Sequence, residues 1–388
     1  MHLTDLSLTD FRSYREAVVR LEPGVSTFLG ANGQGKTNLV EAVAYLATLS
    51  SHRVASDAAL VRQGADRSVV RAKVVRGDRA LLIDLEIVPG KANRVRLGRA
   101  PVKRASDLLG LVKVVRFVPE DLSLVKGGPD ERRRFLDELL VQFTPGVAGV
   151  LADYERVVKQ RSALLKSAAK LTGRSREAAL GSLEVWDDKA AELGGRITAA
   201  RLGLVERLRG TVPPAYGAVA AADGAVTRLT YQARVELPAG QAAGDAAAAS
   251  GGSGLAAQIT AVLKAAMTSG RSQEIERGLT LWGPHRDDLA LELNGLPARG
   301  YASHGESWSL ALALRLGSYE LLRRDLEGDP ILILDDVFAE LDTKRRSALA
   351  QLTAGAEQVL VTAAVAQDVP AELVGAVYRV AGGEVTRG

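Results

Sequence analysis

The sequence of 388 residues contains no cysteine. Disulfide bonds, thiolate zinc sites and iron–sulfur clusters all require cysteine, so none of them contributes to this fold or its chemistry. Histidine is scarce as well, with four residues at His2, His52, His285 and His304. Their positions show no metal-ligand spacing, so we expect no histidine-based metal centre.

Long apolar runs are also missing. No stretch approaches the about 20 consecutive apolar residues of a membrane span. Residues 1–15 carry charge throughout instead of the apolar core of a signal peptide. We therefore expect a cytoplasmic protein without a membrane partner, long enough at 47% hydrophobic residues for two or three domains with their own cores.

Aromatic residues make up only 4% of the chain, and neither an aromatic stacking platform nor a helix-turn-helix is evident. The net charge of +4 is too small to indicate a nucleic-acid partner by itself, but the cations are unevenly placed. A segment at 91–104 contains six cations and no acid: Lys91, Arg94, Arg96, Arg99, Lys103 and Arg104. A second cluster occupies 132–134. Each cluster is either a solvated face or a polyanion-binding surface. For the segment at 91–104, our hypothesis is contact with DNA phosphates.

The most specific pattern present is the octapeptide GANGQGKT, which matches G-x-x-x-x-G-K-[ST]. An apolar stretch precedes it and helical spacing follows it, which predicts strand, loop and helix. Backbone N–H groups of such a loop surround a β-phosphate. The candidate site comprises Gly30, Ala31, Asn32, Gly33, Gln34, Gly35, Lys36, Thr37 and Asn38. Lys36 would reach the β- and γ-phosphates and Thr37 would ligate Mg²⁺; the alternative is a glycine-rich turn that only permits a tight connection.

A hydrophobic run at 331–334 is closed by Asp335 and Asp336, which predicts a buried parallel strand with polar groups at its end. Ligands of open α/β sheets bind at the carboxyl ends of strands. We therefore expect Asp335 to hold Mg²⁺ beside the loop and Asp336 to orient or deprotonate the attacking water. The alternative is a strand whose terminal aspartate caps the next helix.

Three further segments could handle phosphate. Ser303 and Gly305 precede an apolar helix expected from about 307 to 324, where they could initiate the helix or form an anion site. Asp342 opens another helix, and a strand at 358–362 ends in Thr362. The order of these elements resembles that of the ATP-binding-cassette ATPases, particularly their SMC-like branch. That resemblance covers about half of the chain.

The resemblance implies an α/β, P-loop ATPase head that binds ATP and Mg²⁺ and dimerises with ATP, so that one subunit's signature completes the other's site. It assigns roles residue by residue: Lys36 and Thr37 to Walker A, Ser303 and Gly305 to the signature, Asp335 and Asp336 to Walker B, and Asp342 to the D-loop. The chain has Asp336 where glutamate is usual and Thr362 where many transporters have the switch histidine, so we expect slow hydrolysis. No Q-loop glutamine is identified.

The head is expected at 1–125 and 279–388, with 126–278 inserted as a compact, mainly helical arm lobe. Helical spacing in this insertion is interrupted at 145–146, 173, 194–195 and 213–214. Interrupted heptads without cysteine argue against a long SMC or zinc-hook arm. The low-complexity stretch at 237–254 is expected to be a mobile loop.

Longer strings refine the family: FRSY at 11–14, PEDL at 119–122, KGGPDERRRFLD at 126–137 and GPHRDDL at 283–289. With the motifs above they closely resemble the RecF family of recombination-mediator ATPases over nearly the whole chain. The string SHGESW departs from the glutamine-arginine signature commoner in that family. Without this resemblance, GPHRDDL would be interpreted as a charged loop. We assign no role to His285 and Arg286.

The RecF resemblance implies weak, DNA-stimulated ATP hydrolysis and ATP-dependent binding of duplex DNA near single-strand gaps. It also implies a role with RecO and RecR in loading RecA during gap repair and the SOS response. Two alternatives remain: an SMC-like structural DNA clamp, and a small-molecule P-loop kinase that would need neither Ser303 nor a second subunit.

Overall fold

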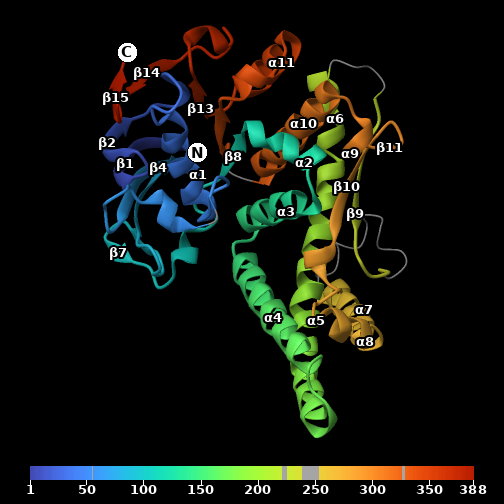
Figure 1. The fold of residues 1–388 in the computed structure, drawn as a ribbon. Helices are drawn as coiled ribbons and strands as arrows, with labels where there is room; N and C mark the ends of the chain where they lie inside the picture. The colour runs from blue at the N-terminus through green and yellow to red at the C-terminus, as the bar shows by residue number, and fades with distance from the viewer. Residues whose placement is uncertain (55, 221–224, 238–252, 326–327) are drawn as a thin grey trace. The chain divides into compact units, whose positions relative to one another are not determined.

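The computed structural model describes residues 1–54, 56–220, 225–237, 253–325 and 328–388 (Figure 1). The chain divides into two compact units. Unit 1 comprises Met1–Lys126, Thr211–Thr227 and Ala298–Gly388, and unit 2 comprises Gly127–Gly210 and Arg228–Pro297. Unit 1 therefore combines the two ends of the chain, blue and red in Figure 1.

A mainly parallel sheet in unit 1 has the strand order β15-β14-β3-β13-β12-β8. Its strands are β3 (Gly24–Leu29), β8 (Val114–Phe117), β12 (Ile331–Asp335), β13 (Gln358–Ala363), β14 (Ala376–Ala381) and β15 (Glu384–Arg387). Only β15, at the edge, pairs antiparallel. Every residue of β12 and β13 is buried, as expected for strands covered on both faces.

An antiparallel sheet in unit 1 has the order β2-β1-β4-β5-β6-β7. Its strands are β1 (His2–Phe11), β2 (Tyr14–Arg20), β4 (Ser68–Arg76), β5 (Arg79–Ile87), β6 (Arg94–Leu97) and β7 (Ala100–Pro101). Helix α1 (Lys36–Thr48) shares one hydrophobic core with residues of both sheets. The sequence of α1 is apolar on most of its sides, which fits a helix enclosed by sheets.

The other helices of unit 1 are α2 (Leu122–Lys126), α6 (Val212–Ala220), α9 (Ala298–Tyr301), α10 (His304–Asp325) and α11 (Thr343–Thr353). Short 3₁₀ helices are η1 (Asp57–Leu60), η2 (Ala105–Leu108), η3 (Pro119–Asp121), η5 (Val337–Glu340) and η6 (Ala366–Asp368). Helix α6 packs closely on α10 at Gly317, where an added Cβ would lie 2.7 Å from Val212 Cγ2.

Unit 2 contains α3 (Pro129–Phe143), α4 (Val147–Ala168), α5 (Gly173–Arg209), α7 (Ser253–Ser269), α8 (Arg271–Arg277) and η4 (Pro284–Arg286). A three-stranded sheet of order β11-β10-β9 completes it, with β9 (Thr227–Gln232), β10 (Asp288–Leu293) and β11 (Leu296–Pro297). Helix α5 packs against both α4 and α7. Apolar side chains of α4, α5 and α7, including Tyr154, Leu193 and Met267, form a core of their own.

The interruption expected at Gly194 and Gly195 is wrong, because α5 runs through both residues. An added Cβ at Gly195 would lie 2.6 Å from the backbone oxygen of Ala256 and 2.3 Å from Thr260 Oγ1. At Gly194 it would lie 3.0 Å from Leu263 Cδ1. These glycines therefore allow α7 to pack close to α5, and do not end the helix.

The unit boundaries differ from the expected 126–278 insertion in two places. Residues 211–227 belong to unit 1, where α6 packs on α10. Residues 279–297 belong to unit 2, where β10 lies beside β9. Most of the low-complexity stretch, at 238–252, lies outside the described residues, and its last two residues begin α7. None of the described helices has the length and apolar character needed to cross a membrane.

Candidate nucleotide-binding site

The glycine-rich loop connects β3 to α1, as the sequence predicts. Lys36 is the first residue of α1, and its side chain is only 3% exposed. Its ammonium group donates to the carbonyl oxygens of Gly30 (2.8 Å) and Ala31 (3.3 Å) and to Asn32 Oδ1 (3.4 Å). The loop therefore fixes the position of the lysine charge.

Gly35 is required by both its backbone and its neighbours. It has a φ of 107°, in the region that favours glycine. An added Cβ would lie 2.8 Å from the Tyr14 hydroxyl oxygen and 2.9 Å from Ser13 Oγ. The Tyr14 hydroxyl donates to the Gly35 carbonyl (3.0 Å), and Ser13 Oγ accepts from Asn38 Nδ2 (2.9 Å). Ser13 and Tyr14 of the FRSY string thus hold the end of the loop in place, a role that was not predicted from the sequence.

Asp335 stands at the carboxyl end of β12 and is 4% exposed. The hydroxyls of Thr37 (3.1 Å) and Thr362 (2.6 Å) both donate to its Oδ1. Burial, assisted by the charge of Asp336, raises the pKa of Asp335 to about 6, although the two hydroxyls and Arg53 lower it. A hydroxyl and a carboxylate that converge in this way are hard oxygen ligands suited to Mg²⁺. A divalent cation here would offset the cost of burying the charge.

Asp336 lies directly after the strand in a left-handed conformation, with a φ of 49°. Its backbone N–H donates to Thr362 Oγ1 (2.9 Å). Thr362 therefore bonds to both aspartates of the pair, because Asp335 and Thr362 are register partners in the parallel sheet. The sequence did not predict these bonds, since they depend on β12 and β13 being neighbours.

Ser303 and Glu306 form a capping box at the start of α10, three residues earlier than expected. Ser303 Oγ accepts from the Glu306 N–H (3.2 Å), and Glu306 Oε2 accepts from the Ser303 N–H (2.8 Å). Ser303 is exposed, and within the described residues its hydrogen bonds stay in this first turn and do not reach Lys36 or the loop. The structure therefore shows helix initiation at Ser303, and the anion site there stays a prediction.

Asp342 caps α11, where its carboxylate accepts from the Arg345 N–H (2.9 Å). The guanidinium of Arg345 lies against Gly305 of the signature segment, because an added Cβ there would be 2.8 Å from Arg345 Nη2. The segments that the resemblance assigns to the D-loop and the signature are therefore in contact within one chain. Arg345 was not among the residues expected from the sequence.

A second group missed by the sequence lies next to the loop. Glu41 of α1 is 1% exposed and receives two bonds from Arg12, at 2.9 and 2.6 Å. Arg53 contacts Glu41 (3.3 Å) and donates to Asn38 Oδ1 (2.9 Å). His52 stays neutral in this group, because burial and nearby arginines lower its pKa to about 3. The FRSY string was the available signal for Arg12.

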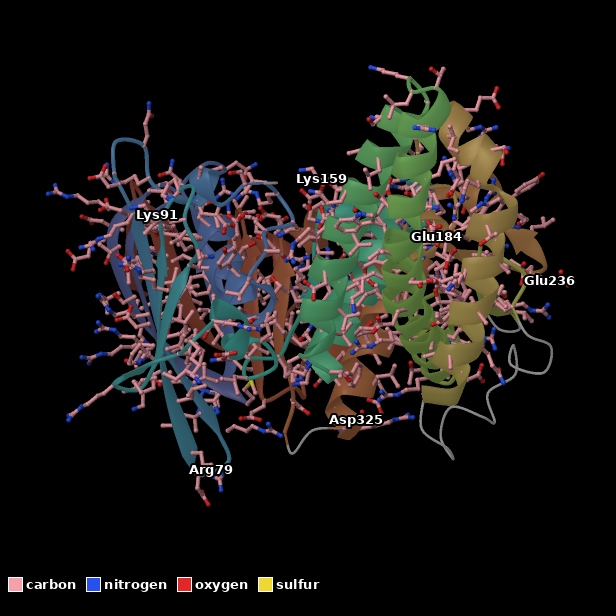
Figure 2. The ribbon with its side chains drawn as sticks, turned by 90° about the horizontal axis from the view of Figure 1, so that it is seen from below. Arg79, Lys91, Lys159, Glu184, Glu236 and Asp325 are labelled. Atoms are coloured by element: carbon pink, nitrogen blue, oxygen red, sulfur yellow. The ribbon has the colours of Figure 1, made fainter. Side chains whose placement is uncertain are left out.

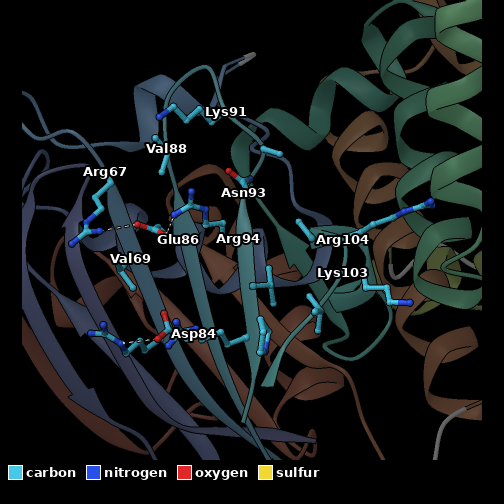
Figure 3. A pocket seen from close by; sticks show the side chains of 17 residues that line it. Arg67, Val69, Asp84, Glu86, Val88, Lys91, Asn93, Arg94, Lys103 and Arg104 are labelled. Carbon is cyan, nitrogen blue, oxygen red and sulfur yellow. Dashed lines mark hydrogen bonds and ion pairs between the residues drawn. The ribbon is translucent and has the colours of Figure 1, made fainter. Parts of the chain in front are cut away.

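The basic segment lies at a hollow of about 850 Å³ on the outer face of the antiparallel sheet (Figure 3). Five of the six expected cations line it, with Arg67 and Arg71 in addition; Arg99, in the β6–β7 turn, does not. Glu86 contacts Arg67 (3.0 Å) and Arg94 (3.5 Å). Arg96 and Lys103 are exposed, and no acidic partner is found for them among the described residues. Figure 2 shows Lys91 and Arg79 at opposite ends of this sheet.

The arginine cluster at 132–134 belongs to unit 2 and is largely used within it. Arg132 forms a bidentate pair with Asp288, with both distances 2.8 Å. Arg133 donates to the Asp287 carbonyl (2.6 Å), and only Arg134 is substantially exposed. The polyanion interpretation of this cluster is therefore not supported.

GPHRDDL also has a structural role in unit 2. His285 Nδ1 bonds to the Tyr154 hydroxyl (2.8 Å), and Nε2 bonds to the Thr280 carbonyl (3.1 Å). Asp287 accepts from the Tyr231 hydroxyl (2.7 Å) and the Arg234 N–H (2.8 Å). The string therefore connects α4 with the segment around β9.

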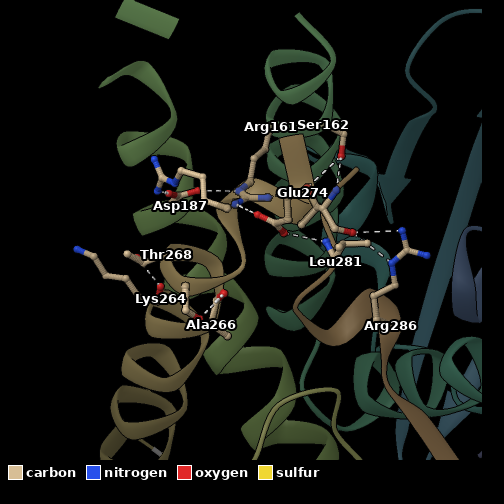
Figure 4. Close-up of polar contacts among 12 residues, drawn as sticks. Arg161, Ser162, Asp187, Lys264, Ala266, Thr268, Glu274, Leu281 and Arg286 are labelled. Carbon is tan, nitrogen blue, oxygen red and sulfur yellow. Dashed lines mark hydrogen bonds and ion pairs between the residues drawn. The ribbon is translucent and has the colours of Figure 1, made fainter. Parts of the chain in front are cut away.

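A largely buried ion network centred on Arg161 lies nearby in the same unit (Figure 4). Arg161 contacts Asp187 (2.7 Å), Glu274 (2.5 Å) and Thr280 Oγ1 (3.1 Å). Arg271 supplies a second cation to Asp187. Arg161, Asp187 and Glu274 are thus each paired with a charge of opposite sign within the unit.

The two-sheet fold, with a phosphate loop, a paired aspartate strand and a capped signature helix, defines an ATPase head of the SMC-like class. The family described as RecF/RecN/SMC N terminal domain matches residues 2–382. Curated relatives called "DNA replication and repair protein RecF" include those of Frankia alni, 59% identical over 387 residues, and Streptomyces avermitilis, 53% identical over 390. Both alignments cover 100% of each chain. The chain belongs to the RecF family.

Solved structures agree with this assignment. The recombination mediator protein RecF with ATP, in the RecFOR pathway, is 25% identical, has a TM-score of 0.85 and is covered over 97% of its chain, with all of the present chain aligned. An Smc head domain with an extended coiled coil from Pyrococcus furiosus has a TM-score of 0.53 at 15% identity. The alignment covers 100% of the present chain and 96% of the Smc chain. The latter supports the fold alone. The α/β ATPase-head class expected from the sequence, and its family, are confirmed.

Proposed function

We propose that this protein is an ATP-dependent DNA-binding protein of recombinational gap repair. The observation that carries the proposal is the bond between Thr37 of the phosphate loop and Asp335 at the end of β12 (3.1 Å), in a chain of the RecF family. The relatives are named for DNA replication and repair, and a solved relative is named with ATP.

The loop residues 30–38 hold the phosphates of ATP in this proposal, with the Lys36 charge beside the β- and γ-phosphates. Thr37 and Asp335 hold Mg²⁺, which neutralises charge that develops on the phosphates. Asp336 orients or deprotonates the attacking water. The shorter reach of Asp336 compared with glutamate supports weak hydrolysis, which DNA stimulates.

A second subunit completes the site. Ser303 and Gly305 sit at the start of a long helix, where the free N–H groups and the helix dipole favour an anion. Ser303 is exposed and does not bond to its own phosphate loop. An ATP-driven homodimer would bring this helix end onto the γ-phosphate held by the other subunit, with Asp342 nearby.

Duplex DNA is the proposed polyanion for the hollow that contains Lys91, Arg96 and Lys103. The remaining expected contacts are Arg94, Arg99 and Arg104. Cations on an exposed sheet face contact phosphates without reading bases, so we expect binding that is independent of sequence. Bound beside a single-strand gap, the dimer would assist RecO and RecR in loading RecA.

An SMC-like structural clamp is the second candidate. It is favoured by α5, whose 37 unbroken residues span about 55 Å. Its antiparallel neighbour α4, however, has 22 residues and spans about 33 Å. The pair is therefore short for a ring-forming coiled coil, so gap repair remains the better proposal.

Sedimentation velocity with and without ATP-Mg²⁺ and duplex DNA tests the proposal. We expect ATP to convert monomer to dimer, and gapped duplex to sediment with the dimer. Lys36→Met should abolish the ATP response, because the β- and γ-phosphates lose their cation. A wild-type protein that binds ATP but stays monomeric would instead favour a small-molecule kinase, and an Lys36→Met variant that dimerises normally would refute the loop assignment.

A further inference from the structure

The signature segment and the D-loop are held together by a single arginine side chain. Arg345, in the first turn of α11, has a side chain that is 20% exposed. Its Nε donates to Ser309 Oγ (2.8 Å) on α10, and its Nη1 pairs with the Asp342 carboxylate. Ser309 is fully buried, so its hydroxyl is a fixed anchor on α10.

The third nitrogen of the guanidinium faces the signature glycine. An added Cβ on Gly305 would lie 2.8 Å from Arg345 Nη2 and 3.1 Å from its Cζ. Within the described residues, Nη2 donates no hydrogen bond. The charge of Arg345 also lowers the pKa of Glu306, after the hydrogen bonds from Ser303, so it acts on the capping box that orients Ser303.

We propose that Arg345 is a positioning residue that sets the signature end of α10 and Asp342 in one fixed arrangement before the second subunit arrives. The inference rests on the proposed ATP-driven dimer. A planar guanidinium can bond to Ser309 and Asp342 at the same time and still lie flat against Gly305, whereas a lysine ammonium cannot match this geometry. Ordering these segments in the monomer reduces the entropy lost on dimerisation.

The test compares Arg345→Ala, Arg345→Lys and Ser309→Ala with the matched control Lys344→Ala, which removes an exposed cation from the same helical turn. Monomer affinity for ATP is measured with a fluorescent nucleotide, and dimer affinity by sedimentation with ATP. Circular dichroism melting identifies any variant that fails to fold.

We expect Arg345→Ala to weaken ATP-dependent dimerisation by about tenfold or more while leaving the monomer's ATP affinity within about twofold of wild type. Arg345→Lys should recover only part of this loss, Ser309→Ala should lose less, and Lys344→Ala should behave as wild type. If Arg345→Ala does not fold, Ser309→Ala and Arg345→Lys decide the question. Wild-type dimerisation by the folded variants, or an equal loss of monomer ATP binding, would overturn the proposal.

Ser303→Arg is measured in parallel to separate this inference from the proposed function. If Ser303→Arg blocks dimerisation but Arg345→Ala does not, only the positioning role is wrong. If Ser303→Arg dimerises as wild type, the composite site itself is wrong.

Discussion

Asp335 of unit 1 and Arg161 of unit 2 are two buried charges with contrasting surroundings. Asp335 is buried, the hydroxyls of Thr37 and Thr362 are the hydrogen-bond donors to its side chain among the described residues, and burial raises its pKa to about 6. In unit 2, Arg161 is buried between two carboxylates, and Asp187 receives a second arginine. A buried acid that lacks a cationic partner and lies beside a phosphate loop indicates a ligand site, whereas a charge matched on every side indicates a structural role.

The same contrast separates the motifs. Thr37 and Asp335 belong to short, common patterns, and their side chains bond to each other at the phosphate loop, where phosphate and metal could bind. GPHRDDL is longer and rarer, yet His285 and Asp287 bond to groups within their own unit. The rarity of a string is therefore a good guide to family and a poor guide to chemistry.

The largest expected effect comes from breaking the matched network of unit 2. Arg161→Met leaves Asp187 and Glu274 less compensated, so we expect a loss of about 3–5 kcal/mol in the free energy of unfolding. Monomer affinity for ATP should not change. Denaturant unfolding followed by tryptophan fluorescence measures the first and nucleotide titration the second.

The control for this prediction is Arg156→Met, which removes an exposed arginine paired with Asp153. We expect it to cost under about 0.5 kcal/mol. Equal losses in the two variants would mean that the buried network is no more important than a surface pair.

A second test addresses the unmatched acids of unit 1. Asp336→Asn keeps the proposed metal ligand Asp335 but removes the proposed base, so we expect hydrolysis to fall by about a hundredfold or more. Nucleotide binding should remain and the ATP-bound dimer should persist longer. Phosphate release and sedimentation measure these effects, with Glu340→Gln as an exposed-acid control. Unchanged turnover would remove Asp336 from the chemistry.

The basic hollow gives the third test. The Ala substitutions are placed at Lys91, Arg96 and Lys103, which line the hollow, because Arg94 is already paired with Glu86. Each lost phosphate contact should reduce the log–log salt slope of duplex binding by about one unit. Arg79→Ala, at the other end of the sheet, is the matched control (Figure 2). An unchanged salt slope in these variants would mean that the segment is a solvated face and does not contact DNA.

The smallest effect concerns pH. Burial, together with nearby arginines, lowers the pKa of His285 to about 4, although a bond to the Thr280 carbonyl opposes this. The unfolded chain therefore takes up a proton at His285 at a higher pH than the folded chain does. The free energy of unfolding thus falls as the pH drops from about 6.5 towards 4.

Between pH 7 and 5.5, the free energy of unfolding should therefore fall by about 1 kcal/mol less in His285→Gln than in wild type. His304→Gln, on the surface of α10, is the control. Denaturant unfolding at the two pH values measures the difference. Identical pH dependence in wild type and His285→Gln would contradict a buried neutral imidazole.

The sequence predicted the elements that depend on local patterns. The loop between β3 and α1, the buried run of β12 and the cap at Ser303 follow from spacing, burial and capping chemistry. Contacts between distant segments were missed, such as Thr362 with Asp335 and Arg345 with Gly305, because they depend on which strands and helices are neighbours. Gly195 was misread because a glycine that ends a helix and one that admits a packed helix are identical in sequence.

The shared ATP site is tested most directly by Ser303→Arg, alone and mixed with Lys36→Met. Alone, Ser303→Arg should bind ATP as a monomer but neither dimerise nor hydrolyse it, because the arginine blocks the helix end that meets the γ-phosphate. In the mixture, one of the two composite sites carries both lesions and the other is intact. Turnover should then recover to at most about a quarter of wild type, if subunits pair randomly. Full ATP-dependent dimerisation and wild-type hydrolysis by Ser303→Arg alone would contradict the account.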